Sequence, residues 1–527
     1  MSISSETDQN HGLVPLWEYL VISSLMLSAC SFSIKPLNPN QAVALSSQAA
    51  TQLTPDQPAP TPMAAFQPIQ PSSGDSSNSD RGQLLSEEGV FLYFTQAGDT
   101  LAAVAARFGV QPEMITSDLP LRTPGLLDPG ISLKIPVQYV ELSRSQSLLP
   151  DSEVIYSPSA ASFDVSAYAN QAAGYFSHTQ DSLSGELLSG ADILARVALD
   201  NSINPRLLLA ILEYECNCVL GEPERSFENE DILGIDASYG LYHQLVWVAE
   251  QLSNGYYGWR SGQLTQLELP GGEIIRLSPM LNAGTVALMT YMAQYEIQKK
   301  ADRQTWEKRL DPATGFMELY QRMFKKPWVR AAKVEPLFPP NLTQPNFQFP
   351  FEIAAIWSYS GGPHWAWEHS GPLAAIDLAP ASAHSGCVPS EEWVTAVADG
   401  LVVRSELGAM LQDLDGDGLE QTGWVILYLH VDTTRIIKTG EYLHAGDHIG
   451  HPSCEGGRAT GTHLHLARKF NGEWMSVKDS VPFILDGWIV HAGENPYEGT
   501  MTSGGQTCIA NSMGPSTSWI LRPVGGK

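Results

Sequence analysis

The sequence predicts a multidomain α+β protein, and three observations support this fold class. At 527 residues the chain is too long for one hydrophobic core, so we expect several domains. A buried helix is indicated at Asn204–Glu215, in a helical domain expected at residues 171–337, and strand-like apolar runs recur at Ala375–Pro380, Trp424–His430 and Gly461–Arg468, in a β-rich domain expected at residues 345–510. Residues 31–88 are rich in Pro, Ser, Gln and Ala, with few aromatic residues. We therefore predict a small βααβ module, a helical middle domain and an antiparallel β-rich domain behind a disordered stalk.

The first 30 residues carry an apolar run, Leu20–Cys30, that is too short to span a bilayer but suits a signal-peptide core. Its end, Leu27–Cys30, resembles a bacterial lipoprotein cleavage box in which Cys30 becomes lipidated. Acidic residues stand where basic ones are expected upstream, which a mis-set start codon or a plain buried apolar segment would explain. We expect residues 1–30 to be a signal peptide and Cys30 to anchor the protein on the outer face of the cell membrane.

Residues 31–88 cannot bury enough apolar surface to offset the entropy of ordering, so we predict a flexible stalk. The formal net charge of −27 argues against nucleic acid and anionic lipid surfaces as partners, because both would repel the chain.

Residues 89–138 alternate between strand and helix signals. Phe91–Thr95 predicts a strand, Ala97–Thr100 a turn and helix cap, and Leu127–Pro136 a turn and second strand. Between them Leu101, Val104, Ala105 and Phe108 have helical spacing. This segment resembles a LysM module, which implies binding to the N-acetylglucosamine-containing glycan of cell walls. The alternative is a βααβ spacer that binds nothing.

A polar linker, residues 139–170, leads to the helical domain at residues 171–337. Asn204–Glu215 predicts a buried helix with proline in its first turn. It faintly resembles the helix that carries the catalytic glutamate of soluble lytic transglycosylases, which implies that Glu215 is a glycan-cleaving acid. Cys216 and His243 depart from that family's pattern. A helical wall-binding or spacing domain is the alternative.

The most informative stretch is Gly461–Arg468, in which His463 and His465 alternate with leucines. Side chains two apart on a strand share a face, so both imidazoles point into the same space. His364, Asp377 and His430 lie upstream in apolar, strand-like runs, and Asp377 is the only charge in its run. Since an unpaired buried carboxylate is costly, Asp377 needs a cation. Two histidines and one carboxylate, with a fourth position for water, are typical of a catalytic zinc site.

Residues from about 357 to 488 resemble the lysostaphin-type and β-lytic zinc metalloendopeptidases that cut peptidoglycan peptides. The resemblance implies that His364, Asp377 and His465 bind zinc and that His430 and His463 are catalytic. His463 would be the general base and His430 would stabilise the oxyanion, and these two roles could be exchanged. The implied substrates are short Gly- or Ala-containing peptides, although glycine-rich proteins are not excluded.

Three further features complete the sequence analysis. Asp413, Asp415 and Asp417 have the spacing of a calcium loop, with Glu420 as a further candidate ligand. The bidentate glutamate of an EF-hand is missing, so an acidic turn is the alternative. We expect a disulfide between two of Cys387, Cys454 and Cys508, without knowing which, and consider Cys216 and Cys218 too close for an easy bridge. The tail, residues 511–527, carries no readable signal.

The sequence therefore predicts an extracellular, lipid-anchored zinc endopeptidase that hydrolyses peptide bonds in bacterial cell-wall peptidoglycan, targeted by a LysM module. Two alternatives remain open: a non-catalytic wall-binding protein, and a bifunctional enzyme whose middle domain also cleaves glycan.

Overall fold

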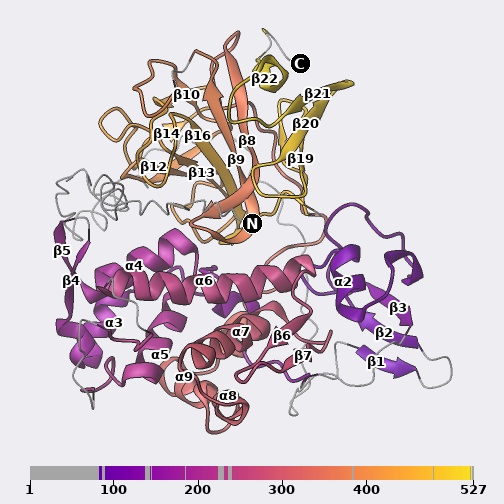
Figure 1. The fold of residues 1–527 in the computed structure, drawn as a ribbon, viewed down its shortest axis with the longest axis vertical. Coiled ribbons are helices and arrows are strands. Elements are labelled where there is room, and N and C mark those ends of the chain that lie inside the picture. The colour runs from indigo at the N-terminus through magenta and orange to yellow at the C-terminus, as the bar shows by residue number, and fades with distance from the viewer. Residues whose placement is uncertain are drawn as a thin grey trace, which may run out of the picture. The chain divides into compact units, whose positions relative to one another are not determined.

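Helices and antiparallel strands follow one another in three stretches of the chain (Figure 1). The computed structural model describes residues 82–85, 90–136, 143, 145–183, 185–223, 231–235, 240–382, 385–478, 480–522 and 524. In this part of the chain the paired strands are antiparallel. Apart from the turn segment 182–188, these residues belong to one compact unit. The mixed helix and antiparallel-sheet class expected from the sequence is confirmed. The predicted signal peptide, Cys30 and most of the stalk lie outside the described residues.

The first stretch is a three-stranded sheet in the order β1-β2-β3, with a helix and a 3-10 turn between its last two strands. Its elements are β1 (Gly82–Leu85), β2 (Val90–Phe94), α2 (Leu101–Phe108), η2 (Pro112–Met114) and β3 (Ser132–Pro136). Thr100 caps α2 by accepting a hydrogen bond from the amide of Ala103, as its position in the turn predicts. The strand β1 comes from residues assigned to the stalk. Its backbone groups pair with the free edge of β2.

The turn that resembles LysM packs against the helical region. Asp99 is buried, ion-paired with Arg107 at 2.6 Å, and accepts a hydrogen bond from Tyr93. Arg107 also donates to the carbonyl of Trp259. Gly98 has a φ of 83°, in the left-handed region that favours glycine, and the guanidinium of Arg260 lies close to it. These contacts fix the module in place, and its binding to glycan stays a prediction.

The second stretch is a helical region whose central pair is α6 (Gly240–Ser261) and α7 (Ala283–Gln298). Its other elements are η3 (Asp151–Glu153), α3 (Val165–Ala172), η4 (Tyr175–His178), α4 (Gly190–Asn201), α5 (Pro205–Cys216), α8 (Arg303–Arg309), α9 (Phe316–Phe324), α10 (Pro327–Ala331) and the two-stranded pairs β4 (Gln180–Leu183) with β5 (Glu186–Ser189) and β6 (Gln266–Glu268) with β7 (Ile274–Arg276). The helices begin inside the predicted linker, because Asp164 caps α3 through the amide of Ala167. No described helix is both long and apolar enough to cross a membrane.

The third stretch is built around a nine-stranded sheet in the order β14-β11-β12-β13-β16-β9-β8-β22, with β17 paired to β16. These strands are β8 (Ile356–Trp367), β9 (Ser370–Pro380), β11 (Gly400–Glu406), β12 (Ala409–Asp413), β13 (Trp424–Leu429), β14 (Tyr442–Leu443), β16 (Leu464–Phe470), β17 (Glu473–Trp474) and β22 (Trp519–Leu521). The last of them follows the turn η6 (Ser516–Ser518) and comes from the tail, which the sequence left unassigned; its backbone pairs with the start of β8.

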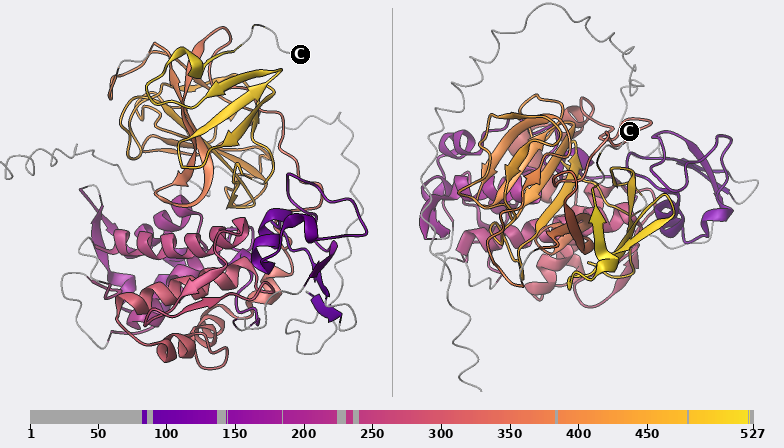
Figure 2. Two further views of the ribbon diagram at one scale, coloured as in Figure 1. Left: turned by 45° about the vertical axis from the view of Figure 1, so that its right-hand side comes forward. Right: turned by 90° about the horizontal axis from the view of Figure 1, so that it is seen from above.

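A smaller sheet stands beside β8 (Figure 2). It consists of β18 (Ile484–Leu485), β19 (Trp488–Ala492), β20 (Gly499–Ser503) and β21 (Gln506–Ile509), and a further pair joins β10 (Val394–Thr395) to β15 (His448–Gly450). The apolar core includes the stacked rings of Phe349, Phe351 and Trp357. We call residues 345–522 the sheet domain.

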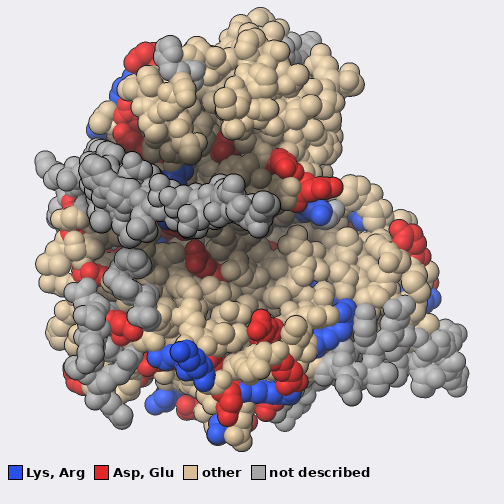
Figure 3. Space-filling model, in the orientation of Figure 1, with Lys and Arg blue, Asp and Glu red and all other residues tan. Residues whose placement is uncertain are grey.

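The helical region contacts the sheet domain at the Phe470 end of β16. Arg260 on α6 pairs with Glu473 at 3.1 Å, and the hydroxyl of Tyr257 accepts from the amide of Trp474. The opposite, Leu464 end of β16 carries the residues predicted to be functional. On the face shown in Figure 3, side chains of both charges gather over the helical region, whereas the upper, sheet domain shows broad uncharged surfaces.

Candidate metal centre and catalytic histidines

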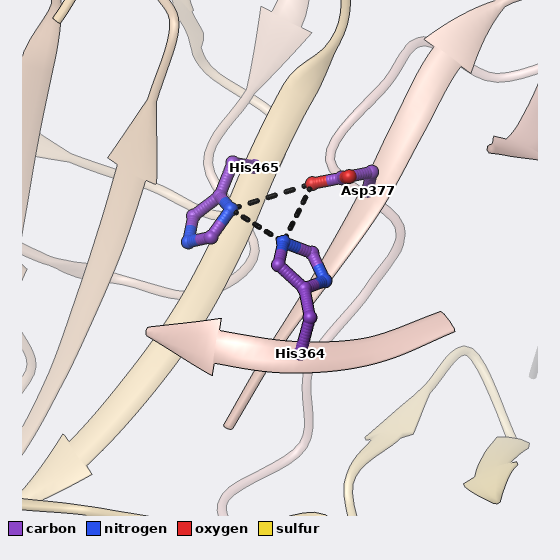
Figure 4. A group of neighbouring side chains, drawn as sticks. All are labelled: His364, Asp377 and His465. Carbon is purple, nitrogen blue, oxygen red and sulfur yellow. Dashed lines mark hydrogen bonds and ion pairs between the residues drawn. The ribbon is translucent and has the colours of Figure 1, made fainter. Parts of the chain in front are cut away.

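Three adjacent strands bring the predicted zinc ligands together. His364 comes from β8, Asp377 from β9 and His465 from β16, and the register places His465 opposite Asp377. The Nε2 atom of His364 and the Nδ1 atom of His465 each lie 3.3 Å from Oδ1 of Asp377 and 3.0 Å from each other. All three residues are buried, and their donor atoms point toward one another (Figure 4).

This donor set fits a zinc ion. Tetrahedral ligands at about 2.0–2.1 Å from zinc are about 3.3 Å apart, which is close to the three distances found. Oδ1 of Asp377 is fully buried and has no hydrogen-bond partner among the described residues. A buried carboxylate oxygen without a partner is costly, and a cation placed among the three donors would satisfy it. Although burial opposes ionisation, His364 and His463 hold the pKa of Asp377 well below its usual range.

Backbone carbonyls set the tautomer of each ligating histidine. His364 donates from Nδ1 to the carbonyl of Gly362 at 2.8 Å, which leaves the lone pair on Nε2. His465 donates from Nε2 to the carbonyl of Ala366 at 3.0 Å, which leaves the lone pair on Nδ1. In both cases the free nitrogen is the one that faces Asp377, as a metal ligand requires.

His430 and His463 lie beside the three ligands. Their ring centroids are 4.5 Å apart, and Nε2 of His463 is 3.5 Å from Oδ1 of Asp377. Each donates from Nδ1 to a carbonyl at 2.7 Å, His430 to Glu455 and His463 to Gly461. Each ring therefore keeps Nε2 available for proton transfer. Burial, reinforced by the neighbouring His463 and His465, lowers the pKa of His430 to about 3, so this ring is neutral at ordinary pH.

His430 has an uncommon backbone conformation. It follows β13 directly with a φ of 67°, in the left-handed region, where histidine occurs more often than most side chains. Strained backbone of this kind costs free energy and often occurs at functional sites. His463 forms an isolated bridge with Ser453 just before β16 begins, so the two histidines lie on neighbouring chain segments.

Sequence reasoning missed Tyr497. Its ring stacks on His364 at a centroid distance of 4.2 Å and lies near Trp365, so it limits how the ligand can turn. Backbone hydrogen bonds with Gly362 and Pro363 hold its segment against β8. Tyr497 carries no motif and is separated from His364 by more than a hundred residues, so no local pattern reveals the contact.

Glu215 is buried in an ion pair. Arg309 contacts both carboxylate oxygens, and the hydroxyl of Tyr291 donates to Oε1 at 3.0 Å. A general acid needs a proton to give and access to the substrate, and these contacts occupy both oxygens. This geometry does not favour the predicted glycan-cleaving acid.

Asp413, Asp415 and Asp417 come together at the loop after β12. Oδ1 of Asp413 accepts from the amide of Asp415, and Oδ2 from that of Gly418, so the loop is closed by its own hydrogen bonds. Burial raises the pKa of Asp413 to about 6. Glu420, the other residue considered, is instead buried with Arg404 and Lys469. Calcium binding stays a prediction.

The structure decides the cysteine pairing among the described residues. Cys387 bonds to Cys454, and Cys508 is buried and free. Cys216 bonds to Cys218, so the expectation that they are too close was wrong. Asn217, between them, has a φ of 52° at the end of α5, and this left-handed turn brings Cys218 back toward Cys216.

Comparison with known proteins finds a matching family model, a similar curated protein and similar solved structures. A family model described as the N-terminal domain of LasA matches residues 147–339, which cover the helical region. Protease LasA of Pseudomonas aeruginosa is 24% identical over 290 residues, which are 53% of this chain and 65% of the relative, so the chain spans less than two thirds of that protein.

Solved structures with similarity include the M23 metalloprotease pseudoalterin, at 20% identity, covering 32% of this chain and 96% of that one with a TM-score of 0.26. The catalytic domain of lysostaphin from Staphylococcus simulans matches at 21% identity, covering 24% of this chain and 89% of that one with a TM-score of 0.17. The chain is thus similar to LasA and to M23 metallopeptidases.

Proposed function

We propose that this protein is a zinc-dependent endopeptidase that hydrolyses peptide bonds in bacterial cell-wall peptidoglycan. One observation carries the proposal: the donor atoms of His364, Asp377 and His465 lie 3.0–3.3 Å apart around a buried carboxylate oxygen that has no hydrogen-bond partner in the described part of the chain. Two further histidines keep a nitrogen free next to this set. A structural zinc site is normally closed by four protein ligands, whereas a set of three leaves a position for water or substrate.

The ligand residues would hold zinc, which supplies a polarised scissile carbonyl and a water whose pKa is lowered toward ~7. His463 accepts the proton of the attacking water at Nε2 and passes it to the leaving amine. Its Nε2 atom lies 3.5 Å from Oδ1 of Asp377, beside the proposed metal ligands. We assign His430 to stabilising the developing oxyanion, and the carbonyl of Glu455 keeps its ring oriented. The two histidine roles can be exchanged without changing the ligand set.

The substrate class follows from similarity and from compartment. The relatives are named as LasA and as the antimicrobial peptidase lysostaphin. From this similarity we propose short Gly- or Ala-containing wall peptides as the substrates. Two disulfides suit an oxidising, extracellular location. We also propose that Cys30 anchors the protein to the membrane and that residues 89–138 bind wall glycan.

The deciding experiment is a digest of purified peptidoglycan, with new amino groups read by mass spectrometry. Wild type and His491→Ala, which changes an exposed histidine bonded to Thr502, should release peptides equally. His463→Ala should lose activity by roughly a hundredfold or more and still bind zinc.

Two outcomes would replace the proposal. Zinc content without any new amines would indicate the non-catalytic wall-binding protein. Reducing ends or anhydro-sugars that vanish in Glu215→Gln would indicate a glycan-cleaving middle domain. An active His463→Ala variant would remove the assignment of the base.

A further inference from the structure

Two loops beside the catalytic histidines are joined by the disulfide between Cys387 and Cys454. The cysteines are 67 positions apart in the chain, and their Cα atoms are 5.7 Å apart. We call residues 385–389 the Cys387 loop and residues 452–457 the Cys454 loop. Neither loop supplies a predicted ligand or a predicted catalytic side chain.

The Cys454 loop holds both histidines through the residues on either side of the cysteine. The carbonyl of Glu455 accepts from Nδ1 of His430 at 2.7 Å. The amide of Ser453 donates to the carbonyl of His430 at 2.6 Å, and the carbonyl of Ser453 accepts from the amide of His463 at 3.3 Å. The loop therefore sets the ring orientation of His430 and the distance between the two histidine backbones.

The Cys387 loop holds the residue next to His463. The carbonyl of Gly386 accepts from the amide of Thr462 at 3.1 Å, and the carbonyl of Val388 accepts from its hydroxyl at 2.6 Å. Together with the disulfide, these contacts form a continuous path between the two histidines. The path runs from His430 through the Cys454 loop and the disulfide to the Cys387 loop, and from there to Thr462 and His463.

Among the described residues, few other contacts hold the Cys387 loop. It contains no helix or strand, and its residues are exposed apart from the half-buried Gly386. Its contacts to Thr462 are the two just described and a longer hydrogen bond, 3.4 Å, from the Thr462 hydroxyl to the carbonyl of Gly386. Segments with few buried apolar contacts open at low free-energy cost. Without the disulfide this loop would move away from Thr462 much of the time. The hydrogen bonds that hold Thr462, and through it the neighbouring His463, would then be lost.

We propose that the Cys387–Cys454 disulfide is a positioning element that holds the Nε2 atoms of His430 and His463 in register with the metal ligands. The inference rests on the proposed function for the roles of the two histidines. It assigns the bridge a part in the reaction rate that is separate from its contribution to overall stability.

The test uses the full-length, zinc-loaded protein and soluble cross-linked muropeptides. In the Cys387→Ser/Cys454→Ser double variant, kcat should fall between roughly tenfold and a hundredfold, because misplaced proton-transfer groups lose rate on this scale. KM should change by less than about twofold, and zinc per chain should not change. The Nδ1–H proton signal of His430, seen in the wild type because its carbonyl partner protects it, should broaden or disappear.

Matched variants separate positioning from general stability. Cys216→Ser/Cys218→Ser removes the other disulfide, in the helical region, and should leave kcat and the His430 signal unchanged. Thr462→Val removes the hydroxyl that bonds Val388 and should lower kcat severalfold, whereas Thr462→Ser, which keeps that hydroxyl, should restore it.

Wild-type kcat and an unchanged His430 signal in the Cys387→Ser/Cys454→Ser variant would overturn the proposal. If that variant does not fold, the Thr462 pair decides: equal kcat in Thr462→Val and Thr462→Ser counts against positioning. If the wild type releases no peptide, the proposed function fails, but the change or persistence of the His430 signal still decides whether the bridge positions the ring.

Discussion

Two buried carboxylates, Glu215 in the helical region and Asp377 in the sheet domain, have different surroundings. Glu215 faces Arg309, which also pairs with Glu296 at 2.7 Å, and receives a hydrogen bond from Tyr291. Asp377 faces three imidazoles and no lysine or arginine within the described ion pairs, and its Oδ1 has no hydrogen-bond partner. Both were predicted functional carboxylates.

The comparison separates a structural carboxylate from one that needs an outside cation. A buried carboxylate is tolerated when the chain supplies a cation with good geometry, and Arg309 does so for Glu215. Asp377 has only histidines, whose other nitrogens are committed to carbonyls so that the free lone pairs converge. A set of neutral donors around one anionic oxygen is arranged for a metal ion.

The largest effect should come from Asp377→Asn, which keeps the shape and removes the anionic ligand. Second-sphere changes alone cost 10–100-fold in metal affinity or activity, so loss of a ligand should cost at least roughly a hundredfold in both. Zinc per chain after dialysis and new amines from peptidoglycan measure the two losses. Asp399→Asn, at an exposed carboxylate, is the control. Full zinc content in Asp377→Asn would show that Asp377 is not needed as a metal ligand and would remove the difference drawn between it and Glu215.

Arg309→Leu should be the next largest change, acting on stability and not on chemistry. It leaves Glu215 and Glu296 buried without their cation, which typically costs about 3–5 kcal/mol. Urea unfolding followed by tryptophan fluorescence measures the loss. Arg303→Leu breaks only exposed pairs and should be nearly neutral. A variant as stable as wild type would show that the Glu215 cluster is not a structural unit.

Glu215→Gln should have a smaller effect, because Arg309 keeps Glu296 as a partner. Loss of one charged hydrogen-bonding partner predicts about 2 kcal/mol or less in the free energy of unfolding. Release of amines from peptidoglycan, per folded molecule, should equal that of wild type. Loss of glycan cleavage products in this variant would instead make Glu215 catalytic.

The smallest effect should be a pH dependence of the free energy of unfolding that comes from Asp413. This third carboxylate, unlike Glu215, has no cation in the described ion pairs. Its folded pKa of about 6 exceeds an unfolded value near 3.9, so the folded state holds the proton more tightly. Its contribution to stability is present below about pH 4 and is lost as pH rises through about 6. Relative to Asp413→Asn, the wild type should lose on the order of 1–2 kcal/mol across that window.

Urea midpoints at a series of pH values measure this difference. If the wild type instead loses stability relative to Asp413→Asn as the pH falls, the pKa of Asp413 is lowered in the folded state and not raised. Added calcium should remove the loss at pH 8 if the loop binds the ion, and should leave it unchanged if the loop is a plain acidic turn.

Local signals in the sequence predicted the elements that depend on neighbours in the chain. Thr100 marks the start of α2 and Pro205 that of α5, since capping and the fixed φ of proline act within one turn. The strands at 82–85 and 519–521 were not predicted, because those residues become strands by pairing with β2 and β8. Each is only three or four residues long, too short for an alternating pattern to be recognised.

By itself, the sequence determined which residue types face one another along each strand, because side chains two apart always share a face: this is why His463 and His465 could be paired in advance. Only the tertiary structure decided which partner each buried charge would have. Arg309 reaches Glu215 across 94 residues, Tyr497 stacks on His364, and Cys387 bonds to Cys454 rather than to Cys508. Such contacts depend on how separate elements pack, and a charge or a thiol carries no record of its distant partner in the residues beside it.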